Sequence, residues 1–314
     1  MIGIDVGGAN LKVVDETGVH IHYCPLFEKA PITSLLEPYA SGKDDSAAVV
    51  MSGELADCFS DKMEGISFIV DAVRRVFPAA QFYGTDAAFH AGAAPVLAAA
   101  NWLASADYLR SKYPRAVLLD IGSTTADIIP LARFDALYGL TDLARLQQGY
   151  LVYTGMLRTN IATLLRTVDI DGVKTPVSSE YFATSADAHL VLGTITAGDY
   201  GCDTPDHKEK TRDASLRRLA RVVCADLDEI GEQGAVQIAR QFRDAQCTMV
   251  CDAVRAIVFA AGADSIIVAG IGAPFFAWQF GATDLNRDLG PAADALPAFA
   301  VREIAMRDGV FSGD

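Results

Sequence analysis

The chain has 314 residues, a hydrophobic content of 51 % and a formal net charge of −14. This length suggests about two domains, and the apolar content suffices for two packed cores. The acidic balance disfavours nonspecific attraction to nucleic acid and to anionic membranes, so we expect small-molecule substrates as partners, with no nucleic acid and no membrane.

The N-terminus shows no pattern typical of an export signal. Met1 leads directly into an apolar strand pattern, without a charged leader before an apolar segment. The most apolar stretch, residues 93–106, contains Asn101 and is shorter than the roughly 20 residues needed to span a bilayer. We therefore expect a cytoplasmic protein. The oligomeric state stays open, and a homo-oligomer is compatible with the sequence.

The first third of the chain is rich in strand patterns. Alternating or continuous apolar residues predict strands over 2–6, 11–14, 19–23, 47–51 and 81–83. Apolar residues at helical spacing predict helices over 62–76 and 95–112. This part of the chain is therefore predicted to be a sheet closed by helices.

The pattern starts again after residue 112. It predicts strands over 116–120, 126–131, 149–153 and 265–269, and helices over 183–192, 215–230, 235–261 and 292–307. Residues 4–14 align without gaps with residues 119–129, and each copy is a strand ending in Asp-x-Gly, a turn of small residues and a second strand. Such self-similarity indicates a repeated structural unit. We place a first domain at 1–112 and a second at 113–291, and we expect helix 292–307 to complete the first.

Both copies carry side chains suited to a phosphate ligand. Asp5 and Asp120 end their strands, where a carboxylate facing a cleft can hold Mg²⁺ directly or through water. Glycines let backbone N–H groups approach an anion, and hydroxyls and a lysine can bind its oxygens. The residues in question are Gly7, Gly8, Lys12, Gly122, Ser123, Thr124 and Thr125. Asp and Gly also form plain turns without a ligand, but the paired copies favour two loops that clamp a diphosphate and its metal.

A third glycine turn, with Gly270 and Gly272, follows the predicted strand 265–269. It is either a simple strand-to-helix turn or a third wall of the same cleft.

The three turns together resemble those of the superfamily of acetate and sugar kinases, heat-shock ATPases and actin. Residues 5–12 resemble its first phosphate loop and residues 120–127 its second, which adds Asn10 and Asp127 to the ligand-binding candidates; residues 270–272 resemble its adenosine loop. The resemblance implies an α/β fold with two duplicated ribonuclease H-like lobes, the actin-like ATPase fold, around a central ligand cleft. These motifs are specific for a fold and not for a reaction.

Segments 53–59, 84–86, 151–159, 180–184 and 202–206 resemble a hydantoinase/oxoprolinase-like family of methanofuran biosynthesis. The resemblance implies a transferase that joins an aminomethyl-furan-methyl diphosphate to the phenol oxygen of γ-glutamyltyramine and releases diphosphate. We then expect Mg²⁺ to be needed and ATP not to be required, with Asp5, Lys12, Glu54 and Asp120 as catalytic residues. Gln147 and Gln148 depart from the family pattern, which has an acidic residue before segment 151–159.

The family motifs contribute four further candidates. Glu54, Asp57 and Asp86 are predicted to hold a substrate ammonium or to accept the phenol proton, although each also suits a loop or cap. Arg158 is predicted to meet the diphosphate or the glutamyl carboxylate, the alternative being a structural ion pair.

Two other functions fit the same fold. One is an ATP-dependent small-molecule kinase or amidohydrolase of this superfamily. The other is a nucleotide-dependent regulatory protein. The six cysteines include no Cys-x-x-Cys pair, which disfavours the iron–sulfur activators among such regulators.

Overall fold

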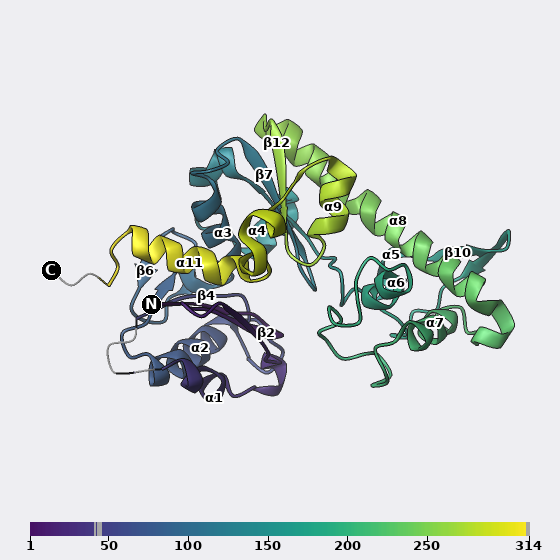
Figure 1. Ribbon diagram of the computed structural model, residues 1–314, viewed down its shortest axis with the longest axis horizontal. Helices are drawn as coiled ribbons and strands as arrows, with labels where there is room; N and C mark the ends of the chain where they lie inside the picture. Colours follow the sequence, from purple (N-terminus) through teal and green to yellow (C-terminus); the bar gives the residue numbers. More distant parts are fainter. Residues whose placement is uncertain (41, 43–45, 312–314) are drawn as a thin grey trace.

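Two mixed sheets form the centre of the protein, and helices cover both of them (Figure 1). The computed structural model describes residues 1–40, 42 and 46–311. A helical module lies beside the second sheet, at the right of Figure 1.

The first sheet has six strands in the order β3 (Val19–Tyr23), β2 (Asn10–Val14), β1 (Ile2–Val6), β4 (Ala47–Met51), β5 (Gln81–Tyr83) and β6 (Phe89–His90). Strand β1 is antiparallel to β2 and parallel to β4. Both β1 and β4 are buried along their whole length because helices cover both faces of the sheet. Helices α1 (Ile32–Leu36) and α2 (Lys62–Val76) cover one face. Asp61 caps α2 by accepting a hydrogen bond of 2.9 Å from the Glu64 N–H.

The second sheet repeats this arrangement. Its order is β13 (Thr283–Asp284), β12 (Ser265–Ala269), β7 (Ala116–Ile121), β8 (Ala126–Pro130) and β9 (Leu151–Val152). Strand β7 is antiparallel to β8 and parallel to β12, as β1 is to β2 and β4. Two sheets with one strand order and one set of directions confirm the predicted duplicated α/β fold.

Helices α3 (Asn101–Leu109) and α11 (Leu296–Arg307) form a layer between the two sheets. Their apolar side chains share a core with Ala48 and Val50 of β4 and with Leu118 of β7. Helix α11 lies directly on β1, where a Cβ at Gly3 would be 2.0 Å from the Ala298 carbonyl oxygen. Helix α11 therefore packs against the first strand, and only glycine at position 3 permits this approach.

The helical module has a core of its own. It contains α5 (Ile161–Leu164), the hairpin β10 (Thr167–Ile170) and β11 (Val173–Pro176), α6 (Ser185–Val191), α7 (Arg212–Arg221) and the first part of α8 (Leu227–Ala261). The second part of α8 and helix α9 (Ala273–Phe280) cover the second sheet. Across the described part of the chain, no helix combines the length and the apolar content needed to cross a bilayer.

Two predicted helices were too long. The helix predicted over 95–112 begins at Asn101, because Ala99 has a φ of 48° that no right-handed helix accommodates. The helix predicted over 215–230 is broken between α7 and α8. Cys224 has a φ of 58° there, and Asp226 caps the new helix by accepting from the Glu229 N–H at 2.9 Å.

Candidate functional site

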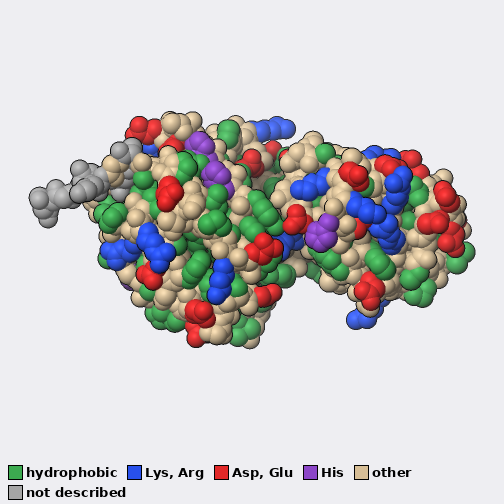
Figure 2. Space-filling view, turned by 90° about the horizontal axis from the view of Figure 1, so that it is seen from below, with side chains coloured by type: hydrophobic (Ala, Val, Ile, Leu, Met, Phe, Trp, Pro, Cys, Tyr) green, Lys and Arg blue, Asp and Glu red, His purple; other side chains and the backbone are tan. Residues whose placement is uncertain are grey.

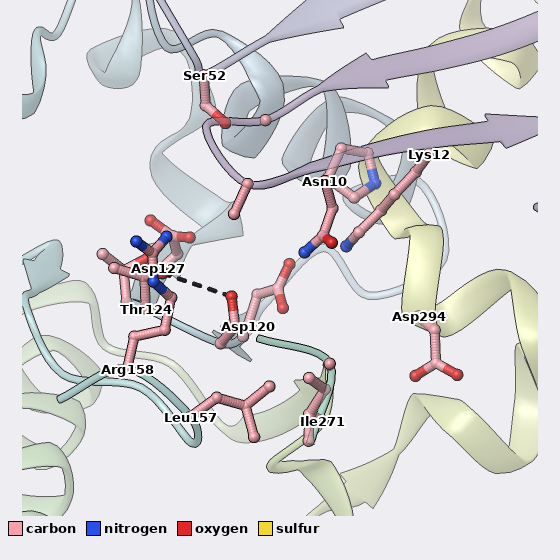
Figure 3. A pocket seen from close by; sticks show the side chains of 18 of the residues that line it. Asn10, Lys12, Ser52, Asp120, Thr124, Asp127, Leu157, Arg158, Ile271 and Asp294 are labelled. Carbon is pink, nitrogen blue, oxygen red and sulfur yellow. Dashed lines mark hydrogen bonds between the residues drawn. The ribbon is translucent and has the colours of Figure 1, made fainter. Parts of the chain in front are cut away.

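A cleft of about 740 Å³ lies between the two sheets, where the carboxyl ends of β1 and β7 face each other. Figure 3 shows the first loop on one side of it and the second loop on the other. The predicted site residues that line it are Asp5, Gly7, Gly8, Asn10, Lys12, Asp120, Gly122, Ser123, Thr124, Thr125, Asp127, Arg158 and Gly270. The fold thus brings together residues more than 100 positions apart, and their contact with a ligand stays a prediction.

The two turns have the same backbone geometry. The Gly7 N–H donates to the Asn10 carbonyl at 2.9 Å, and the Gly122 N–H donates to the Thr125 carbonyl at 3.0 Å. A Cβ at Gly8 or at Gly122 would meet nothing within 4 Å. Both turns therefore leave their backbone open toward the cleft, as an anion cradle requires.

Asp5 and Asp120 are carboxylates in a poorly solvated place. Burial raises the pKa of Asp5 to about 6, although the charge of Lys12 opposes the rise. Burial, together with the charges of Asp127 and Asp5, raises the pKa of Asp120 to about 7. Asp5 Oδ1 is buried without a hydrogen-bond partner among the described residues. A cation between the two carboxylates would satisfy this oxygen and stabilise both charges.

This donor set fits Mg²⁺ better than a softer or more demanding metal. In the described ranges, no group of three or more His, Cys, Asp or Glu residues is placed to hold a metal. Mg²⁺ is usually bound by one or two carboxylates, with waters and substrate phosphates as the remaining ligands. Asp5 and Asp120 supply that number of carboxylates at the cleft.

Asp127 has a basic partner of its own. It accepts a hydrogen bond from Arg145, which is buried and also donates to Asp142 at 2.8 Å. The Arg145 guanidinium carbon lies 4.3 Å from the centre of the Trp102 ring. Arg145 is therefore neutralised and stacked in place beneath the cleft.

The other two basic side chains of the cleft, Lys12 and Arg158, differ from Arg145 in this respect. Neither side chain makes an ion pair or a hydrogen bond within the described ranges, whereas Arg145 makes both. Figure 3 shows Lys12 and Arg158 on opposite sides of Asp120. The cleft therefore presents two separate unpaired cations to a ligand.

Residues 154–159 form a brace against the second loop. A Cβ at Gly155 would lie 2.5 Å from the Thr124 backbone nitrogen, so only glycine allows this contact. The N–H groups of Leu157 and Arg158 both donate to the Ser123 carbonyl at 3.0 Å. This family motif thus fixes the second loop and places Arg158 beside it.

A buried polar chain holds the brace from behind. The Gln246 amide on α8 donates to Thr154 Oγ1 at 2.8 Å and to the Gly155 carbonyl at 2.9 Å. Its oxygen is hydrogen-bonded with His189 on α6 at 2.7 Å. Burial lowers the pKa of His189 to about 4, so the ring is neutral near pH 7. The helical module therefore supports the second loop through neutral hydrogen bonds.

Three predicted acidic residues lie outside the described cleft lining. Glu54 is buried behind the first loop, where burial raises its pKa, and its Oε2 has no hydrogen-bond partner among the described residues. Asp57 is exposed at the surface. Asp86 is paired with His90 at 3.0 Å in an exposed turn. Their contact with a substrate stays a prediction.

Gly272 lies outside the described cleft lining, so its predicted contact with a ligand stays a prediction. A Cβ there would lie 2.5 Å from Ile121 Cγ2 and 3.1 Å from Met156 Sδ. The glycine therefore serves close packing between the third turn and β7. Gly270, by contrast, lines the cleft and has a φ of 84°.

The described cleft lining also includes residues that sequence reasoning missed, among them Asp294 and Tyr23. Asp294, from the segment before α11, lines the cleft, and its pKa is raised by partial desolvation while Lys12 opposes the rise. Tyr23, from the edge strand β3, lines the cleft and donates a hydrogen bond of 3.2 Å to Asp203 in the helical module. Neither residue lies in a glycine motif, so no local signal marked it.

The matching strand orders and the facing glycine turns define a two-lobed protein of duplicated ribonuclease H-like sheets with one central cleft. Comparison with known families then identifies the branch. The family model described as hydantoinase/oxoprolinase matches residues 45–277. The chain belongs to this family.

Two curated relatives carry the same name, (4-{4-[2-(gamma-L-glutamylamino)ethyl]phenoxymethyl}furan-2-yl)methanamine synthase. The protein from Methanocaldococcus jannaschii is 34 % identical over 87 % of this chain and 86 % of its own length. The protein from Methanococcus vannielii is 38 % identical over 50 % of this chain and 70 % of its own length. The family predicted from the sequence motifs is thereby confirmed.

Solved structures give weaker likenesses. A ROK family glucokinase from Streptomyces griseus has a TM-score of 0.42 at 13 % identity, covering 95 % of this chain and 97 % of its own. An acetone carboxylase has a TM-score of 0.44 at 13 % identity, covering 93 % of this chain and 51 % of its own.

Proposed function

We propose that this protein forms an aryl ether: it transfers an aminomethyl-furan-methyl group from diphosphate to the phenol oxygen of γ-glutamyltyramine. The product would be the compound in the name of its two relatives. The observation that supports a diphosphate substrate is the pair of facing glycine turns with Asp5 and Asp120 at their strand ends.

The reaction balances without an oxidant or a reductant. The bond between the furan-methyl carbon and the diphosphate oxygen breaks, and both electrons leave with the diphosphate. The phenol oxygen forms the new bond to that carbon and loses its proton, which ends on the released diphosphate or in the solvent. The furan ring stabilises positive charge on the carbon, so the protein mainly has to stabilise the leaving diphosphate and position the phenol.

The residues of the cleft match these two tasks. The open backbone at Gly8 and Gly122 and the Lys12 ammonium would bind the diphosphate. Asp5 and Asp120 would hold Mg²⁺, which neutralises charge on the departing diphosphate. Because the substrate carries its own leaving group, no nucleotide is needed to drive the reaction.

The test is a two-substrate assay followed by mass spectrometry, with the furan diphosphate, γ-glutamyltyramine and Mg²⁺, with and without ATP. We expect the ether and inorganic diphosphate to form at equal rates in both conditions. Strict dependence on ATP hydrolysis, or a phosphorylated product in place of the ether, would overturn the proposal and favour a kinase.

The metal requirement is tested in the same assay. Chelation of Mg²⁺ should abolish turnover, and readdition should restore it. Full turnover in metal-free buffer would remove Mg²⁺ from the mechanism while leaving the ether-forming reaction intact.

A further inference from the structure

Arg158 occupies a different part of the cleft from Lys12. Figure 3 shows the two on either side of Asp120. Lys12 lies opposite Asp5 in the register of the first hairpin. Its positive charge opposes the rise in the pKa values of Asp5, Asp120 and Asp294. Lys12 therefore lies in the part of the cleft where the carboxylates suit a metal ion and a diphosphate.

Arg158 instead faces groups that come from other segments. Burial and Asp203 raise the pKa of the Tyr23 phenol, and the Arg158 charge opposes them. Burial likewise raises the pKa of Tyr181 and of Cys202, and Arg158 again opposes the rise. The Arg158 charge thus acts on two phenol rings and a thiol, whereas the Lys12 charge acts on the strand-end carboxylates Asp5 and Asp120.

This region is also where the protein bridges the cleft. Tyr23 comes from the first sheet, and its hydrogen bond to Asp203 joins that sheet to the helical module. Figure 2 shows the larger body and the module meeting at a narrowed waist. Tyr23 lines the cleft and is 45 % exposed, so its ring remains available to stack on an aromatic ligand.

We infer that Arg158 binds the carboxylate of γ-glutamyltyramine, with Tyr23 beside the phenol ring of that substrate, whereas Lys12 serves the diphosphate of the other substrate. The inference rests on the proposed function. A guanidinium is the preferred partner for a carboxylate because its planar fork bonds both oxygens. The Arg158 backbone is held on the Ser123 carbonyl at 3.0 Å, so this anchor keeps a fixed position relative to the second loop.

The test compares γ-glutamyltyramine with the analogue whose α-carboxylate is an amide. Wild-type protein should prefer the carboxylate by about 10- to 100-fold in kcat/KM, the range expected for a charge-assisted contact. Arg158→Met should lose this preference and leave the KM for the furan diphosphate unchanged. Lys12→Met should keep this preference and raise the KM for the furan diphosphate. Arg255→Met, at an exposed arginine on α8, is the matched control and should change neither.

A role of Arg158 at the diphosphate would give a different result. If Arg158→Met slows both acceptors equally and raises the KM for the diphosphate, Arg158 serves the diphosphate and the inference is wrong. Calorimetric binding of γ-glutamyltyramine without the second substrate separates this failure from that of the proposed reaction. Binding to wild type but not to Arg158→Met supports the anchor even if no ether forms, and equal binding to both overturns it. Thermal unfolding checks that each variant is folded.

Discussion

The two glycine loops have the same backbone but opposite charges at one equivalent position. In the first hairpin Lys12 lies opposite Asp5 in the strand register, and in the second Asp127 lies opposite Asp120. Lys12 makes no ion pair in the described structure, whereas Asp127 is bonded to the buried Arg145. One copy of the repeat therefore offers an unpaired cation to the cleft, and the other copy has its extra charge neutralised from within.

The loops also differ in what holds them. The first is held by the segment that follows β3: the N–H of Cys24 donates to the Ala9 carbonyl at 2.8 Å, and that of Leu26 to the Gly8 carbonyl at 3.1 Å. The second is held by the brace at 154–159 and, behind it, by the helical module. The two copies of the motif thus keep one backbone geometry, although the first presents an unpaired cation and the second is held by additional hydrogen bonds.

Removing either strand-end carboxylate should have the largest effect. Asp120→Asn and Asp5→Asn should each lower kcat by about 10²–10³-fold, comparable to the loss of one electrostatic stabilising group. Stability should be unchanged or higher, because burial already disfavours the charged forms. Steady-state kinetics and thermal unfolding of the two variants provide the measurement. A stable variant with the wild-type rate would show that its loop is only a turn.

The contrast between Lys12 and Arg145 should appear in stability. Arg145→Met leaves Asp127 and Asp142 without their partner, which should cost about 3 kcal/mol in the free energy of unfolding. Lys12→Met breaks no ion pair and should cost less than about 1 kcal/mol. Urea unfolding measures both. Equal losses would contradict the view that only the second loop has an internal counterion.

The brace predicts a smaller loss. Gly155→Ala places a methyl group against the Thr124 backbone, which should cost about 1–3 kcal/mol and distort the second loop. The control is Gly92→Ala, where a Cβ meets nothing within 4 Å and the effect should be within about 0.5 kcal/mol. Urea midpoints of both variants give the comparison. A Gly155→Ala protein as stable and active as the control would show that the contact is not needed.

The buried histidine behind the brace predicts a pH effect that the first loop lacks. The pKa of His189 is about 4 in the folded protein and 6.5 as its ordinary value, so the unfolded chain binds the proton first as pH falls. The stabilising contribution is complete above pH 6.5 and is lost below it, by about 2 kcal/mol between pH 7 and pH 5. Asp5 and Asp120, whose pKa values are raised, act in the opposite sense.

The histidine is isolated by comparing wild type with His189→Gln at both pH values. The variant should lose less stability on acidification, by that same amount. An identical pH dependence of the two proteins would show that His189 does not titrate as described.

The repeated Asp-x-Gly turns could be predicted from the sequence because they are local. A strand pattern followed by Asp, a glycine and small residues requires a tight turn wherever it occurs, and two aligned copies at 4–14 and 119–129 indicate a repeated fold. Glu54, Asp57 and Asp86 show the limit of such reasoning. Each is an acidic residue of a family motif, but the described cleft lining includes none of them, because the side of a loop that faces a cleft depends on tertiary packing.

Amino-acid order by itself determined the strands, the two turns and the chemistry that each turn carries, because these depend on neighbouring residues. Only the tertiary structure decided which side chains face one another across the cleft and between the elements. Tyr23 meets Asp203, and Arg145 meets Asp127, through packing of elements that no local pattern connects. The layer of α3 and α11 sets the distance between the sheets, and the helical module sets the position of Arg158. Partners across a cleft depend on how whole elements pack, and that depends on the summed burial of distant side chains.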